Sequence, residues 1–259
     1  MNPVTLATGL LLCGALASAF CEPVSTTSAS ALVESMRAAR ESDGFEMRVS
    51  LQRSGAAAGD VVKIALIGQF HDGRERLLVR GIAPADIRGH SIVSERFGDR
   101  IESTSYEQAS TPGASRADPS AGVFGSAMIV WDLMAPWWDW PVQIDEGPRT
   151  ISGHACTQVR SRSDHRREGS TVTEAISCVD APNGLAWRTT LLDSHHHVLR
   201  SIEVTRVLRT QAGRSAARSA SITDADGTVT LVEVYGGDEH YEIRPDTFET
   251  PARLVPAKG

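Results

Sequence analysis

The residues best suited to metal chemistry in this sequence are three consecutive histidines, His195, His196 and His197. Neighbouring side chains on a strand point to opposite faces, so only the first and third could share a metal ion. The sequence offers no third ligand at a useful spacing, and the three residues fall between two apolar segments. The pattern therefore favours an exposed turn over a metal site.

Two other pairs have residue types that are used in catalysis. His154 lies two positions before Cys156, as a Cys–His nucleophile would require. Asp132 and Asp139 are a candidate carboxylate pair, although Asp132 is better suited to capping a helix. No G-x-S-x-G elbow, phosphate-binding glycine pattern or H-E-x-x-H motif occurs. We therefore predict a protein that is not an enzyme and that uses no metal or cofactor.

A basic cluster surrounds the polar segment SDHRREG. Its members are Arg160, Arg162, His165, Arg166 and Arg167. At a hairpin tip these charges are expected to be solvated, and docking of an acidic partner or a lipid headgroup is the alternative. The formal net charge of −6 gives no argument for binding nucleic acid.

Tryptophan is concentrated in residues 124–141, which read FGSAMIVWDLMAPWWDWP. This tryptophan segment holds four of the five tryptophans, although aromatic residues are only 5% of the chain. The four are Trp131, Trp137, Trp138 and Trp140. So much ring surface must be covered by a core, a ligand or a partner.

Local signals predict how the tryptophan segment folds. Ser126 is expected to cap a helical turn that runs through Trp131, Asp132 and Leu133, and Pro136 is expected to end it. The last three tryptophans stand around an acidic residue, so we expect at least one of them at a rim. A permanent core, a lid that contacts a lipid, and contact with a protein partner all remain open.

The surrounding sequence predicts one helix and about ten strands. Apolar residues recur at helical spacing over residues 28–40, and from Phe45 the period changes to two. Further strands are expected at 61–70, 76–82, 91–97, 100–106, 150–162, 170–179, 185–192, 198–208, 218–222 and 229–235, with a loop over 108–122. This order predicts an α+β protein built on a large, curved antiparallel sheet.

A disulfide is expected between Cys156 and Cys178. If the hairpin around SDHRREG is centred on residue 167, these cysteines lie opposite each other, and so do Arg160 and Glu174. Closing a loop of this size would stabilise the fold by about 3 kcal/mol on a chain-entropy model. Two reduced, buried cysteines are the alternative.

The N-terminal residues have the features of an export signal. Residues 1–19 contain no Asp, Glu, Lys or Arg, and Ala17-Ser18-Ala19 has the form of a signal-peptidase site, so cleavage is expected after Ala19. Phe20 before Cys21 argues against lipid attachment at that cysteine. Residues 20–27 then form a short linker and 28–259 a single domain. No other apolar run is long enough to span a membrane, so a soluble mature protein is expected, and the export signal predicts that it lies in the periplasm.

The tryptophan segment and its context resemble the outer-membrane lipoprotein-sorting proteins of the LolA-like superfamily. Members often carry Gly-Ser-Asp, then Asp-Leu, then a strand with a Gly-x-x-Cys or similar turn. The matching positions here are Gly125, Ser126, Asp132, Leu133, Gly153 and Cys156. Ala127 stands where the family has the first Asp. The order of elements agrees with that of the superfamily over most of the mature chain, and the resemblance is specific in about thirty residues.

The resemblance implies a half-barrel whose concave face is plugged by the N-terminal helix and by the central helical segment. It also implies a non-catalytic periplasmic protein that carries the acyl chain of a lipid or lipoprotein in an apolar cavity. The candidate lining or lid residues are Trp131, Leu133, Met134, Trp137, Trp138 and Trp140. The alternative is an interaction or stress-sensor module that contacts another envelope protein.

Overall fold

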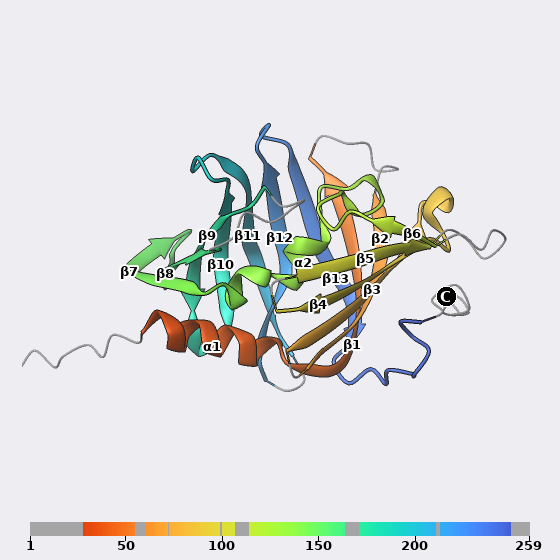
Figure 1. Ribbon diagram of the computed structural model, residues 1–259, viewed down its shortest axis with the longest axis horizontal. Coiled ribbons are helices and arrows are strands. Elements are labelled where there is room, and N and C mark those ends of the chain that lie inside the picture. The colour runs from red at the N-terminus through yellow and green to blue at the C-terminus, as the bar shows by residue number, and fades with distance from the viewer. Residues whose placement is uncertain are drawn as a thin grey trace, which may run out of the picture.

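A computed structural model describes residues 28–54, 61–71, 73–98, 100–106, 114–163, 171–210 and 213–249 of the chain. These residues form a single antiparallel sheet of thirteen strands with few helices (Figure 1). The strand order across the sheet is β6-β5-β4-β3-β2-β1-β13-β12-β11-β10-β9-β8-β7. The two edge strands, β6 and β7, are therefore consecutive in the chain.

The elements follow one another with short connections. The strands are β1 (Ser42–Arg53), β2 (Val62–His71), β3 (Arg74–Ala83), β4 (Ser91–Phe97), β5 (Arg100–Tyr106), β6 (Ala114–Ala117), β7 (Val142–Ile151), β8 (His154–Arg162), β9 (Glu174–Asp180), β10 (Leu185–Leu192), β11 (Val198–Arg209), β12 (Ser215–Asp224) and β13 (Val229–Asp238). The helices are α1 (Ala29–Arg40), α2 (Val130–Met134) and the 3-10 turns η2 (Ala85–Ile87), η3 (Val123–Gly125), η4 (Pro136–Asp139) and η5 (Ala181–Asn183).

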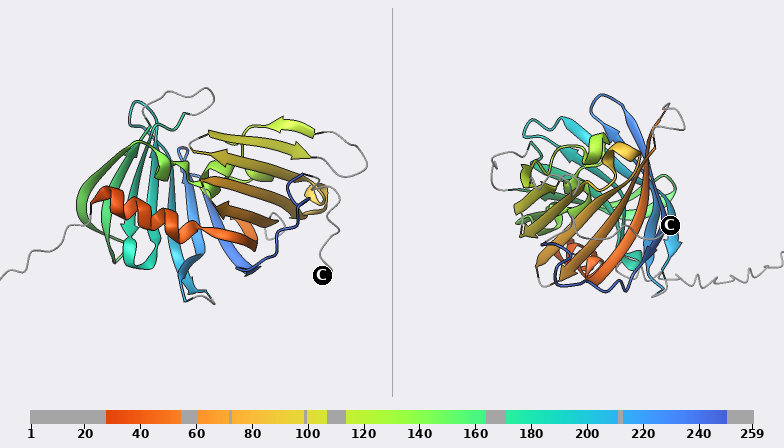
Figure 2. Two further views of the ribbon diagram at one scale, coloured as in Figure 1. Left: turned by 60° about the horizontal axis from the view of Figure 1, so that its bottom comes forward. Right: turned by 90° about the vertical axis from the view of Figure 1, so that its right-hand side faces the viewer.

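The topology explains why the tryptophan segment crosses the molecule. Strands β1 to β6 form a meander that ends at one edge of the sheet, and β7 begins at the other edge. The chain between them returns across the inside of the curve, where Figures 1 and 2 show α2. Strands β7 to β13 then form a second meander, which closes on β1 by pairing Val49 with Val234.

The concave face of the sheet holds two apolar clusters. One joins α1 and the four tryptophans of the tryptophan segment to strands β8, β9 and β10. The other joins η3 and α2 to β1, β2, β3 and β12. Helix α1 begins as expected, because the Ser28 hydroxyl accepts a hydrogen bond from the amide of Ala31 at 3.3 Å. The prediction that two helical elements plug the concave face is confirmed.

The chain that follows β13 covers part of the convex face. Phe248 is buried against Ile67, Leu78 and Val93, on β2, β3 and β4. Their neighbours in sequence face the concave side, so these strands are apolar on both faces. Gly44 lies within β1, and its missing side chain leaves room for the Tyr241 carbonyl.

Two of the sequence-based predictions about strands are wrong. The expected strand at 150–162 is two strands, because Ser152 and Gly153 have positive φ angles and reverse the chain between β7 and β8. The expected loop at 108–122 contains β6, which pairs with β5 at Ser105 and Ser115. Most other strands lie within a few residues of their predicted bounds. The described residues contain thirteen strands, where about ten were expected.

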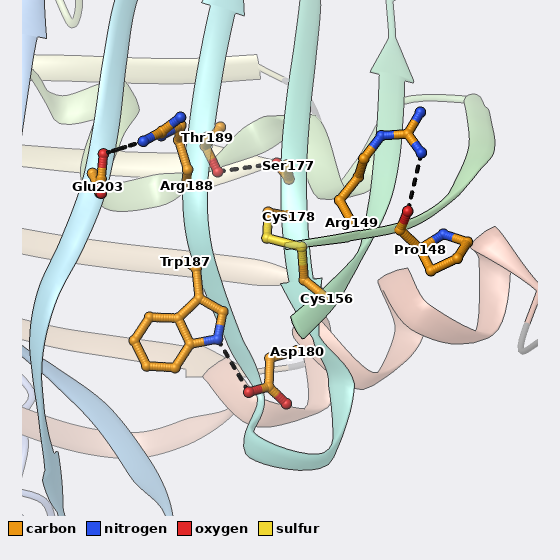
Figure 3. Close-up of a disulfide and its surroundings, with 10 residues drawn as sticks. All are labelled: Pro148, Arg149, Cys156, Ser177, Cys178, Asp180, Trp187, Arg188, Thr189 and Glu203. Atoms are coloured by element: carbon orange, nitrogen blue, oxygen red, sulfur yellow. Dashed lines mark hydrogen bonds and ion pairs between the residues drawn. A yellow bond between two sulfur atoms is a disulfide. The ribbon is translucent and has the colours of Figure 1, made fainter. Parts of the chain in front are cut away.

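The Cys156–Cys178 disulfide is confirmed, with 5.4 Å between the two Cα atoms (Figure 3). The predicted register is wrong by two residues, because Gln158 lies opposite Cys178. The hairpin is thus centred on residue 168, and most of the connecting turn lies outside the described residues. The Arg160–Glu174 ion pair is present, but it runs diagonally, with Ile176 opposite Arg160.

Candidate functional site

The tryptophan segment folds as two short helical turns with a sharp bend between them. Helix α2 ends at Ala135, which has a left-handed backbone (φ 41°, ψ 56°), and η4 begins at Pro136. The α2 N-cap is Ile129, whose amide donates to the Asp132 carboxylate at 3.0 Å. The predicted cap at Ser126 is wrong, because that hydroxyl donates to the Val123 carbonyl within the preceding turn.

All four tryptophans of the segment are buried. Their exposed fractions are 6% for Trp131, 3% for Trp137, 3% for Trp138 and 2% for Trp140. The expected rim position is therefore wrong. The reason is the bend at Ala135, which lets rings on both sides of it enter the same cluster against Leu32, Val33 and Met36 of α1.

An ion pair joins α2 to the sheet. Arg200, on β11, donates to Asp132 at 2.9 Å and also to Asp224 at 2.6 Å. The same guanidinium donates to the carbonyl of Ala127. Burial raises the pKa of Asp132 to about 6, although the Arg200 charge acts in the opposite direction.

A second charged cluster joins α1, the tryptophan segment and the first meander. Arg40, in the last turn of α1, donates to Glu75 at 3.1 Å and to the carbonyls of Leu133 and Met134 at 3.3 and 3.0 Å. Arg96 pairs with Glu75 and with Asp139. Buried charges with this many partners fix α1 and the tryptophan segment on the sheet as one unit.

Further hydrogen bonds hold the carbonyl groups of the tryptophan segment. Gln143, on β7, donates to the carbonyls of Trp137 and Trp140 at 3.1 and 2.9 Å. Arg37 of α1 donates to the carbonyl of Trp138 at 2.7 Å. The segment is thus attached to its surroundings by separate polar contacts as well as by ring packing.

A cavity of about 610 Å³ lies beside the last turn of α1. Its walls come from helix α1, the start of β1, the end of β2, η5, the end of β11 and the start of β12. Its apolar lining includes Ala39, Phe45, Met47, Phe70 and Pro182. None of the described residues of the tryptophan segment lines it. Trp138 borders instead a smaller polar cleft of about 260 Å³, beside Arg40 and Arg96.

The residues with catalytic or metal-binding chemistry are not assembled into a site. Asp132 and Asp139 belong to the two separate ion clusters, and the Cys156 thiol is in the disulfide. His154 stacks on Trp187, with ring centroids 3.5 Å apart. The three histidines form a turn after β10, as predicted. Among the described residues, no group of three His, Cys, Asp or Glu side chains is placed to hold a metal.

The basic cluster is only partly described. Arg160 pairs with Glu146 and Glu174, and Arg162 with Glu174 at 2.8 Å. The other three members, His165, Arg166 and Arg167, lie outside the described residues. The described part is thus a ladder of mixed charge on the convex face.

The buried arginines were missed by the sequence-based predictions. Strand alternation contained a signal for one of them, since Arg200 shares a strand face with Ile202, which packs into both concave clusters. A charge at such a position must be paired in the interior. The partner, Asp132, is distant in sequence and gave no matching signal.

Comparison with known proteins shows the fold. No protein-family model and no curated protein matches the sequence. A solved DUF1329 family protein from Desulfovibrio piger matches with a TM-score of 0.75 and 15% identity, over 86% of this chain and 97% of its own. A putative outer membrane lipoprotein-sorting protein domain from Vibrio parahaemolyticus matches with a TM-score of 0.72 and 12% identity, over 85% of this chain and 95% of its own.

A LolA superfamily protein from Nitrosomonas europaea matches with a TM-score of 0.67 and 15% identity, over 86% of this chain and 98% of its own. Identities this low establish the fold alone. The chain has the LolA-like fold, an open and strongly curved antiparallel half-barrel, as the resemblance of its motifs implied.

Proposed function

We propose that this protein is a non-catalytic periplasmic carrier that binds the acyl chain of a lipid or lipoprotein. The observation that carries the proposal is the cavity of about 610 Å³ between α1 and the sheet, with its apolar inner wall. Its volume lies within the range of about 300–1,000 Å³ that is usual for small-molecule sites. Each methylene that enters would gain about 0.8 kcal/mol.

Helix α1 forms one wall of the cavity and also packs against the tryptophan segment. Both are attached to the sheet by ion pairs and by hydrogen bonds to carbonyl groups, as at Arg40 and Arg200. If α1 moves outward, the cavity extends toward the rings that α1 now covers. The candidate contacts for a longer chain are then Trp131, Leu133, Met134, Trp137, Trp138 and Trp140.

The cellular location belongs to the same proposal. An export signal cleaved after Ala19 would deliver residues 20–259 to the periplasm, and an oxidising compartment suits the disulfide. Among the described residues, no helix is both long and apolar enough to cross a membrane.

Native mass spectrometry of protein exported from cells tests the carrier proposal. We expect a co-purifying lipid, released on denaturation. Ala216 lines the cavity, so Ala216→Phe should reduce the bound fraction by filling the space. Ala114→Phe is the matched control, because Ala114 is an exposed strand residue away from the cavity. Exported protein that carries no lipid, and then binds none after addition of phospholipid or lipopeptide, would rule out the carrier.

A further inference from the structure

The rim of the cavity carries two arginines on neighbouring strands. Arg209 ends β11 and Arg214 directly precedes β12, so both belong to the same hairpin. Both side chains are exposed and both line the cavity. The same lining includes the apolar side chains of Phe45 and Met47 from β1. The site thus combines an apolar interior with cationic groups at its opening.

These arginines differ from those that fix the fold. Arg40, Arg96 and Arg200 are paired with carboxylates. Arg209 instead donates to the Gly213 carbonyl at 2.9 Å, and Arg214 to the Ala39 carbonyl at 3.5 Å. Within the described part of the chain, neither guanidinium pairs with an acidic side chain. Most of their hydrogen-bonding capacity therefore faces solvent.

Acidic residues also border the cavity, but on other elements. Glu41 follows α1 and Glu239 follows β13. Arg40, the third arginine of the lining, is compensated by Glu75. The positive charge that can meet a ligand is therefore concentrated on the hairpin side of the opening.

We infer that the cavity takes an amphiphile whose headgroup is an anionic phosphate, with the acyl chain inside and the phosphate oxygens on Arg209 and Arg214. This inference rests on the proposed carrier function and adds the class of headgroup. Guanidinium groups suit phosphate because their donors form a planar fork. The chain itself has a net charge of −6, so selection for an anion must come from local groups.

The test compares two ligands with the same acyl chain, lysophosphatidylglycerol and lysophosphatidylcholine, by titration calorimetry below their micelle concentrations. The unmodified protein should bind the anionic ligand about 5- to 10-fold more tightly, as expected for two exposed charge contacts. The preference should shrink at high salt, because exposed charges are screened. Inorganic phosphate alone should not bind at the same concentrations.

The double variant Arg209→Gln/Arg214→Gln should lose the preference and keep the binding of the choline ligand. The matched control is Arg88→Gln/Arg149→Gln, because both residues are exposed and donate to local carbonyls away from the cavity. The control should keep the preference.

Equal binding of both ligands by the unmodified protein would overturn the headgroup inference and leave the carrier proposal standing. A preference that survives in the double variant would also overturn it. Phosphate that binds as tightly as the amphiphile would show an anion site without an acyl chain. Binding of neither lipid would remove the carrier proposal together with this inference.

Discussion

Arg200 on β11 and Asp132 on α2 are 68 residues apart and form a buried ion pair with 2.9 Å between Nη1 and Oδ2. The pair connects the tryptophan segment, which runs between the two sheet edges, with the middle of the second meander. Asp132 also caps α2 through the amide of Ile129. One carboxylate thus both starts a helix and attaches it to the sheet.

The buried Asp132 predicts a pH-dependent stability. Its pKa rises from 3.8 to about 6 on folding, so between these values the folded state binds the proton that the unfolded state has released. The stabilisation that this raised pKa contributes to the unfolding free energy is therefore fully present below about pH 4, and it is lost as the pH rises to about 6. Asp132→Asn should remove this component from a plot of unfolding free energy against pH.

Urea unfolding followed by tryptophan fluorescence between pH 4 and 7.5 measures this component. Asp224→Asn is the control, because Asp224 also bonds to Arg200 but is partly exposed. It should leave most of the pH-dependent component in place, because burial is the largest cause of the raised Asp132 pKa and the Asp224 charge contributes less. A pH profile that is identical in Asp132→Asn and the unmodified protein would contradict the assignment to Asp132.

The attachment of α1 depends on Arg40. Replacing it by Met keeps the aliphatic stem but removes hydrogen bonds to Glu75, Leu133 and Met134. Hydrogen bonds to charged groups contribute about 1.5–3 kcal/mol, so we expect a loss of about 2 kcal/mol in unfolding free energy. Faster hydrogen exchange should appear in α1 and in the tryptophan segment.

Arg48→Met is a suitable control for Arg40, because Arg48 is exposed and, within the described ranges, pairs only with Glu46. Its stability should change by less than about 1 kcal/mol, as is usual for surface pairs. Equal effects of the two substitutions would show that Arg40 does not hold the helix.

The disulfide should stabilise the sheet without acting on the cavity. Cys178 faces the convex side with Leu185 and Trp187, whereas its neighbour Val179 packs into the concave cluster. Reduction should lower the unfolding free energy by about 3 kcal/mol, as expected for a loop of 22 residues. Urea unfolding with and without reductant measures the loss. Lipid binding under native conditions should be unchanged.

A Cys156→Ser/Cys178→Ser double variant provides the control for reduction. It should be as stable as the reduced protein, and the reductant should have no further effect on it. A large effect of reductant on the double variant would point to another thiol.

Hydrophobic periodicity predicted much of the sheet, because one face of most strands packs inward. Strands β4, β5 and β10 have the bounds that alternation and turns indicated. Strand β7 was missed because its apolar residues Val142 and Ile144 are exposed, so they do not mark a face of the strand that packs inward. The apolar residues on both faces of β2 reflect the distant C-terminal segment, which no local window contains.

The candidate site was less predictable than the fold. The tryptophan segment was found from composition, but its rings form core, and the cavity lies beside α1. That cavity is lined by the ends of helices and strands that are far apart in the sequence and meet only in the folded protein, such as the segments with Phe45 and Pro182. Its position depends on how far α1 reaches along the sheet, which sequence periodicity does not specify. A ligand-contacting role for the tryptophans stays a prediction.

The C-terminal segment should depend on the absence of a side chain at Gly44. A Cβ atom at this position would lie 2.2 Å from the Tyr241 carbonyl oxygen and 2.8 Å from Ile243 Cγ1, so the backbone would have to shift. Gly44→Ala should therefore cost about 1–3 kcal/mol in unfolding free energy, as overpacking usually does. Hydrogen exchange should increase in residues 241–249.

Gly236→Ala is the matched control, because a Cβ atom there would meet only Arg48 Cδ at 3.8 Å. That substitution should be neutral or slightly stabilising, since alanine restricts the unfolded chain more than glycine does. If Gly44→Ala were as stable as Gly236→Ala, the close approach of Tyr241 to β1 would not exist in solution. The C-terminal segment would then have to cover the convex face of β2 to β4 along a different path.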